Sequence, residues 1–190
     1  MNTKALSLKP LSFTVNGAPV GPIEVPEGLS LNDVLHEYLG LTGCRTVCGM
    51  GVCSACTVIV DSDEGSSELQ SCITPAHAMQ GRAIRTIEGH ARKDGARKDG
   101  ARKNGDGAID NLSDVQQAFL RHFSFQCGYC TPGFVAAATV LLERVRKQPI
   151  ARDEVDGAVA AALEPHLCRC TGYVRYYAAV KELVLAQGTR

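Results

Sequence analysis

Eight of the nine cysteines fall into two groups of four, and each group has the spacing of ligands to an iron-sulfur cluster. The first group reads C-x4-C-x2-C, with a fourth cysteine after fifteen further residues, and consists of Cys48, Cys53, Cys56 and Cys72. This is the plant-type spacing for a [2Fe-2S] cluster. The second group joins a C-x2-C pair to a later C-x-C pair and consists of Cys127, Cys130, Cys168 and Cys170. Two groups in one chain predict two redox centres and, therefore, electron transfer.

The residues between the first three cysteines are small. Gly49, Gly51, Ser54 and Ala55 allow the backbone to curl tightly and to turn its N–H groups toward a cluster. The same stretch contains a G-x-G pattern, but a dinucleotide site needs a strand before the glycines and a helix after them. Here a helix is expected before and a strand after, so we exclude nucleotide binding at this loop.

The second group lies at two predicted helix starts. Cys127 and Cys130 directly precede Thr131-Pro132-Gly133, and Cys168 and Cys170 precede the last helical segment. Free N–H groups and the helix dipole stabilise thiolates at such positions. Structural zinc is the alternative for this group, because four-cysteine zinc sites are often built from C-x2-C pairs. The plant-type spacing elsewhere in the chain favours iron.

One cysteine and five histidines remain outside the two groups. We expect Cys44, four residues before Cys48, to be a bystander rather than a ligand. We assign no histidine to metal, since eight thiolates suffice for two clusters. His166 lies two residues before Cys168 and is the histidine to examine for a contact with the second centre.

Elements that could position the first group follow a β-grasp order. Residues 11–15 and 23–25 flank an Asn-Gly turn and predict a β-hairpin. Ser30 and Asp33 predict a helix cap, apolar residues recur at helical spacing from 31 to 39, and Gly40 ends the helix. Residues 57–60 and 83–87 predict further strands. These elements make up an expected domain over residues 1–90.

Residues 91–107 repeat the unit ARKDG and contain no large apolar side chain, so we predict a flexible basic linker over residues 91–110. Beyond it the apolar spacing becomes helical. Four helices are expected, around residues 113–123, 131–146, 155–163 and 173–184, the first capped by Ser113 and Gln116. The fold class is therefore α+β: a β-grasp, plant-type ferredoxin domain, then a four-helix bundle domain over residues 111–190.

Composition excludes several classes of function. Twenty basic and twenty acidic side chains cancel, so no net field directs the chain to nucleic acid or anionic lipid. The longest apolar stretch, residues 134–142, is too short to cross a bilayer. The start MNTKALSLKP has neither an apolar signal core nor paired arginines, which favours the cytoplasm, or the periplasm only if a partner carries the export signal. Proteins are the expected partners.

Three stretches resemble one known family: residues 48–58, residues 126–133 (QCGYCTPG) and residues 167–173 (LCRCTGY). They are similar to the iron-sulfur small subunit of the molybdenum hydroxylases, the family of xanthine dehydrogenase, aldehyde oxidoreductase and CO dehydrogenase. The resemblance implies a relay without a substrate site or catalytic residue of its own. It also implies a large molybdopterin-binding partner, an FAD or haem (cytochrome) partner, and pterin contacts at Gln126 and Cys170.

Several functions remain open on this basis. The resemblance implies that single electrons pass from the pterin through both clusters to FAD or haem, and that the partner oxidises an aldehyde, with a purine or an N-heterocycle as the alternative. An iron-sulfur redox sensor that uses the basic repeat on nucleic acid is a hypothesis from a different class. The sequence lacks a recognition helix rich in Arg or Lys, which argues against the sensor.

Overall fold

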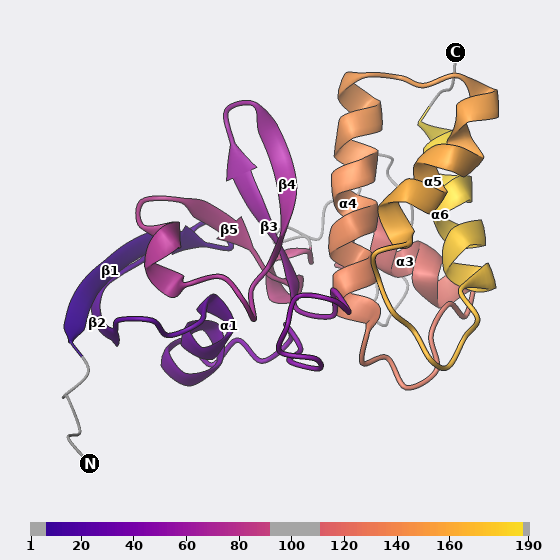
Figure 1. Cartoon of the computed structure of the whole chain (residues 1–190). Helices are drawn as coiled ribbons and strands as arrows, with labels where there is room; N and C mark the ends of the chain where they lie inside the picture. Colours follow the sequence, from indigo (N-terminus) through magenta and orange to yellow (C-terminus); the bar gives the residue numbers. More distant parts are fainter. Residues whose placement is uncertain (1–6, 92–110, 188–190) are drawn as a thin grey trace.

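The computed structural model describes residues 7–91 and 111–187, and the predicted linker lies outside these ranges except at residue 91. The first described part forms a mixed β-sheet with short helical turns, and the second is helical (Figure 1). The chain is therefore α+β, as predicted. Within the described ranges, no helix is long and apolar enough to span a membrane.

The sheet has five strands in the order β2-β1-β5-β3-β4. Strands β1 (Leu8–Val15) and β2 (Ala18–Pro26) form the predicted antiparallel hairpin, and Asn16 and Gly17 take positive φ angles at its turn. Strand β5 (Ala83–Arg85) pairs parallel to β1 and antiparallel to β3 (Thr57–Ser62), while β4 (Gly65–Gln70) pairs with β3 at the edge. A short helical segment, residues 31–38, packs against this sheet.

That helical segment begins as α1 (Leu31–Asp33) and continues as a wider π-helical turn, η1 (Val34–Tyr38). The Ser30 hydroxyl accepts a hydrogen bond from the Asp33 backbone N–H, as the capping pattern predicted. Gly40 follows with φ +65°, which ends the helix. Leu31 and Leu35 are completely buried in the core of the sheet half.

The second part contains the four predicted helices: α3 (Asp114–Arg121), α4 (Thr131–Lys147), α5 (Val155–Leu163) and α6 (Val174–Ala186). Ser113 and Gln116 form a complete capping box at the start of α3. Helix α4 is central: its buried residues pack with those of the other three helices in one core. Short turns η2 (Ala76–Met79), η3 (Ile87–Gly89) and η4 (Arg152–Glu154) complete the described elements.

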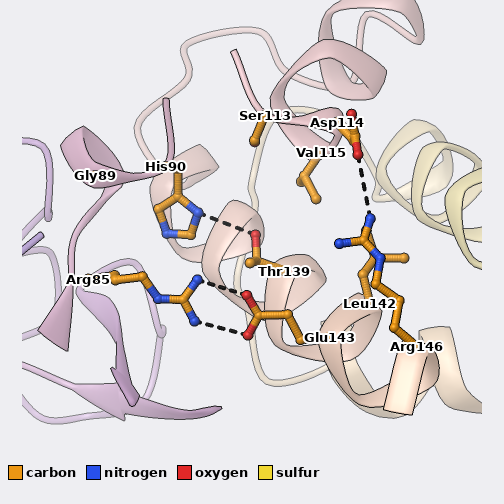
Figure 2. Close-up of a pocket in the computed structure, with 10 residues that line it drawn as sticks. All are labelled: Arg85, Gly89, His90, Ser113, Asp114, Val115, Thr139, Leu142, Glu143 and Arg146. Carbon is orange, nitrogen blue, oxygen red and sulfur yellow. Dashed lines mark hydrogen bonds and ion pairs between the residues drawn. The ribbon is translucent and has the colours of Figure 1, made fainter. Parts of the chain in front are cut away.

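The two parts meet where α4 lies beside β3 and β4 (Figure 1). Arg85 on β5 joins them: its guanidinium donates to Asp61 on β3 and to both carboxylate oxygens of Glu143 on α4, at 2.8 and 2.9 Å. Figure 2 shows Arg85 paired directly with Glu143, with His90 and Thr139 above them. All four residues line a cavity of about 230 Å³. Polar groups therefore link the sheet to the helices.

Two details differ from the sequence-based expectation. Strand β4 was not predicted, because its sequence GSSELQ is polar and carries little β-propensity; pairing with β3 forms it. Helix α3 ends at Arg121, and Phe123 has a φ of +50° and is 74% exposed rather than part of the apolar stripe.

Candidate iron-sulfur centres

The first cysteine loop runs between η1 and β3 and curls as the glycine pattern predicted. Gly49, Gly51 and Ser54 all have positive φ angles, of +66°, +73° and +54°. A Cβ atom added to Gly51 would lie 2.5 Å from a side-chain carbon of Ile73, so only glycine fits there. The loop thereby comes close to the turn after β4 that carries Cys72.

In the first group the Cys48 thiol interacts with that of Cys53, and the Cys56 thiol interacts with those of Cys72 and Cys53. Backbone N–H groups, led by that of Met50 at 3.5 Å from the Cys48 sulfur, lower the pKa of Cys48 to about 6. Burial raises the pKa of Cys56 to about 11. These amides thus favour the thiolate at Cys48, the form that binds metal.

The second group forms two pairs. The Cys127 and Cys170 sulfurs are 3.6 Å apart, and the Cys130 thiol interacts with Cys168. Cys130 is the N-cap residue of α4, while Cys168 and Cys170 lie in the loop that leads into α6. Each of the two pairs therefore joins one cysteine before α4 to one cysteine before α6.

Burial distinguishes the members of this second group. It raises the pKa of Cys130 to about 12. Burial also acts on Cys168, but the Thr171 hydroxyl at 3.1 Å and the backbone N–H groups of residues 170 and 171 outweigh it and lower the pKa of Cys168. Hydrogen bonding with Cys127 raises the pKa of Cys170. A bound metal would displace the protons from all four thiols.

The two-by-two arrangement fits a two-iron cluster better than zinc. In a four-cysteine [2Fe-2S] cluster each iron ion takes two thiolates, whereas a structural zinc ion gathers four ligands around one point. Both groups therefore have the donor set and the spacing for [2Fe-2S].

The second group has an exposed side and a side turned toward the first group. Cys127 and Cys170 are exposed, and Gln126 donates from its side-chain amide to the Cys170 carbonyl at 3.1 Å. The structure thus places the two expected pterin contacts side by side. On the opposite side, the Leu167 N–H donates to the Cys53 carbonyl at 3.1 Å, one residue before Cys168. The two cysteine loops are in direct contact.

Cys44 lies beside the first group but bonds backbone and serine oxygens rather than a thiol. Its thiol is buried, donates to the Cys56 carbonyl at 2.9 Å and lies 3.2 Å from the Ser71 hydroxyl. Burial raises its pKa to about 12. This thiol supports the backbone beneath the first loop, in keeping with the expected bystander role.

Two side chains at the centres had no strong sequence signal. His166 does not contact Cys168 through its ring; its Nε2 lies 3.1 Å from a carboxylate oxygen of Glu68 on β4. The Arg45 guanidinium lies over the Tyr129 ring, 5.4 Å from its centroid, and so joins the first loop to the second. Both pairs link residues far apart in the chain, which no local pattern reveals.

Comparison with known proteins agrees with this geometry. Residues 13–84 match the 2Fe-2S iron-sulfur cluster binding domain, and residues 86–181 match the [2Fe-2S] binding domain. The xanthine dehydrogenase iron-sulfur-binding subunit of Escherichia coli O157:H7 is 38% identical over 163 residues, which are 86% of each chain. The aldehyde oxidoreductase iron-sulfur-binding subunit of Escherichia coli K12 is 32% identical over 189 residues, covering 95% of this chain and 73% of the relative.

Comparison with solved structures identifies the same kind of protein. The fold matches a chain of quinoline 2-oxidoreductase from Pseudomonas putida 86 with a TM-score of 0.72 and 33% identity, over 95% of this chain and 96% of that one. This chain belongs to the family of iron-sulfur subunits of the molybdenum hydroxylases. It is an electron-transfer subunit of a multi-subunit oxidoreductase, with two [2Fe-2S] cluster-binding domains.

Proposed function

We propose that this chain carries single electrons from the molybdopterin-binding subunit to a subunit that holds FAD or haem. The contact between the two cysteine loops is the observation that carries this proposal. The Leu167 N–H donates to the Cys53 carbonyl at 3.1 Å, so the buried side of one group adjoins the other. The exposed Cys127 and Cys170 are then free to face the electron donor.

The ligands we propose are the two sets of four cysteines: Cys48, Cys53, Cys56 and Cys72 for the first cluster, and Cys127, Cys130, Cys168 and Cys170 for the second. Their pairing supports this assignment. The domains we propose are a plant-type, β-grasp ferredoxin domain over residues 1–90, a linker over 91–110 and a four-helix domain over 111–190. Strand order and helix content support these domains.

Each cluster, when bound, takes up and releases one electron. The chain's own residues supply the surroundings. The Met50 N–H and its neighbours donate toward Cys48 and favour negative charge on sulfur. The Tyr176 ring is fully buried behind Cys130, with its hydroxyl 3.9 Å from the Cys130 sulfur, and excludes water from the inner side of the second group. These contacts hold both centres rigidly while charge passes.

We place the molybdopterin at Gln126 and Cys170. The Gln126 amide already donates to the Cys170 carbonyl, which holds both residues on one exposed surface. An exposed thiolate ligand beside a polar amide is suited to meet the polar edge of a pterin. The remaining amide N–H and oxygen of Gln126 supply a donor and an acceptor for that edge.

For the substrate of the partner we propose an aldehyde. The match to the aldehyde oxidoreductase subunit extends over 189 residues, more than the 163 residues of the xanthine dehydrogenase match. An N-heterocycle is the second candidate, since the quinoline enzyme's chain matches over 96% of its length. We propose that the complex lies in the cytoplasm, where a reducing environment keeps the cysteines available as thiolate ligands.

The test is to purify the complex with its native partners and to add an aldehyde, xanthine or quinoline without oxygen. Reduction of both clusters by the aldehyde, seen by electron spin resonance, is the expected result; reduction only by xanthine or quinoline contradicts the substrate assignment. Gln126→Ala should slow cluster reduction about tenfold, by loss of the pterin contact, at unchanged iron content. Gln148→Ala, at the opposite end of α4, is the control. Equal rates in both variants would refute the pterin contact.

A further inference from the structure

A completely buried histidine lies between the two cysteine loops and has no part in the proposed ligand sets. The His166 side chain is 1% exposed, in the loop after α5. Its Nε2 bonds Glu68 of β4 at 3.1 Å, while its Nδ1 is buried with no hydrogen-bond partner. Burying an unpaired polar nitrogen costs free energy, so this position calls for a reason beyond filling space.

The imidazole fills the point where three segments meet. Its ring centroid is 5.2 Å from that of Phe134 on α4. A Cβ added to the adjacent Gly133 would lie 3.1 Å from the His166 Nδ1 and 2.3 Å from the Ser54 carbonyl oxygen. Helix α4, the histidine and the first cysteine loop are therefore packed without spare room.

The residue after the histidine links the two loops through the backbone: the Leu167 N–H donates to the Cys53 carbonyl at 3.1 Å. Cys168 follows directly. A route of covalent bonds and this one hydrogen bond thus joins the two proposed ligand sets. Because Leu167 itself is 51% exposed, its own side chain does little to hold the link.

We propose that His166, fixed by Glu68 and Phe134, is a positioning residue that keeps the Leu167–Cys168 backbone bonded to Cys53 and so sets the rate of electron exchange between the clusters. Glu68 anchors one edge of the ring to the sheet half, and the Phe134 contact fixes the ring on the helical half. The functional part of this inference rests on the proposed relay, but the geometric part does not.

Two variants remove the anchor in different ways. His166→Leu keeps an apolar side chain in the buried space and loses the bond to Glu68. Glu68→Ala leaves the imidazole in place and removes its partner; because the Glu68 side chain is 26% exposed, this change is the milder one for folding. The matched control is His122→Leu, since His122 bonds Glu182 at 2.6 Å within the helical half and does not reach the sheet.

Hydrogen exchange of the Leu167 amide in the full chain tests the geometry without reduction of any cluster. Glu68→Ala and His166→Leu should each speed this exchange about tenfold, whereas His122→Leu should leave it unchanged. Unchanged exchange in both test variants, or an equal increase in the control, would overturn the proposal.

Electron transfer in the iron-loaded complex tests the consequence. We expect slower reduction of the first cluster by way of the second, and a smaller spin-spin splitting between the two reduced clusters, with both midpoint potentials unchanged. A merely structural histidine would alter stability but not this rate at constant iron content. Faster amide exchange with an unchanged transfer rate would overturn the functional part, while failure of substrate to reduce either cluster in the wild type would contradict the relay itself.

Discussion

Replacement of Arg85 by methionine tests how the sheet half and the helical half are held together. The guanidinium donates to Asp61, Glu143 and the Ser66 hydroxyl, all at 2.8 to 3.0 Å. Its side chain is 25% exposed, and those of Asp61 and Glu143 are 37% and 30% exposed. Methionine keeps the stem but leaves two carboxylates unpaired near each other (Figure 2).

The size of the effect follows from this partial burial. Removing one partner of a fully buried pair costs about 3–5 kcal/mol, and an exposed pair contributes at most about 1 kcal/mol. We therefore expect Arg85→Met to cost about 2 kcal/mol. In a chain of this size that lowers the melting temperature by about 4–8 °C.

The assay is thermal bleaching of the visible absorbance of the iron-loaded chain at neutral pH. The matched control is Arg121→Met, because Arg121 bonds Glu182 within the helical half and both side chains are more than half exposed. We expect the control to shift the midpoint by at most about 4 °C, and by less than Arg85→Met. Equal shifts in the two variants would refute the reasoning that Arg85 joins the two halves.

Three further predictions concern single residues. Burial lowers the pKa of His90 from 6.5 to about 4. Between these two pH values the unfolded chain binds more protons at this residue than the folded chain does. The free energy of unfolding therefore falls on acidification, by about 2 kcal/mol between pH 7 and pH 5. Urea unfolding should show a smaller loss of unfolding free energy in His90→Gln than in the wild type over this pH range. Parallel pH profiles of the two proteins would contradict the prediction. Cys44→Ser should retain the spin-resonance signal of the first cluster while Cys56→Ser loses it; loss in both would make Cys44 a ligand. Gly51→Ala should lower iron content more than Gly49→Ala, because only at Gly51 does an added Cβ meet a side chain; equal iron loss would contradict the close approach.

Local patterns were sufficient for most elements of the fold. The Asn-Gly turn, the Ser113–Gln116 capping box and the apolar spacing of α4 each depend on residues close in sequence, and the structure confirms all three. The family resemblance is likewise confirmed by the domain matches. Strand β4 could not be predicted, because its polar residues are held by pairing with β3 rather than by their own propensity.

The cysteine spacing predicts two ligand groups, and the pairs Cys127–Cys170 and Cys130–Cys168 are consistent with the second of them. The contacts between the groups were beyond the sequence. His166 and Glu68 are 98 residues apart, and only the packing of α4 against the sheet brings them together. Such contacts depend on the relative placement of the two halves, which no periodicity within either half specifies.

The most direct test of the central claim is iron and acid-labile sulfide analysis of the purified native complex, combined with electron spin resonance after substrate reduction. We predict about four iron and about four sulfide per chain, with two distinct signals that both arise when substrate is added. A single iron centre, or sites filled by an ion that cannot be reduced, would contradict the proposed electron relay.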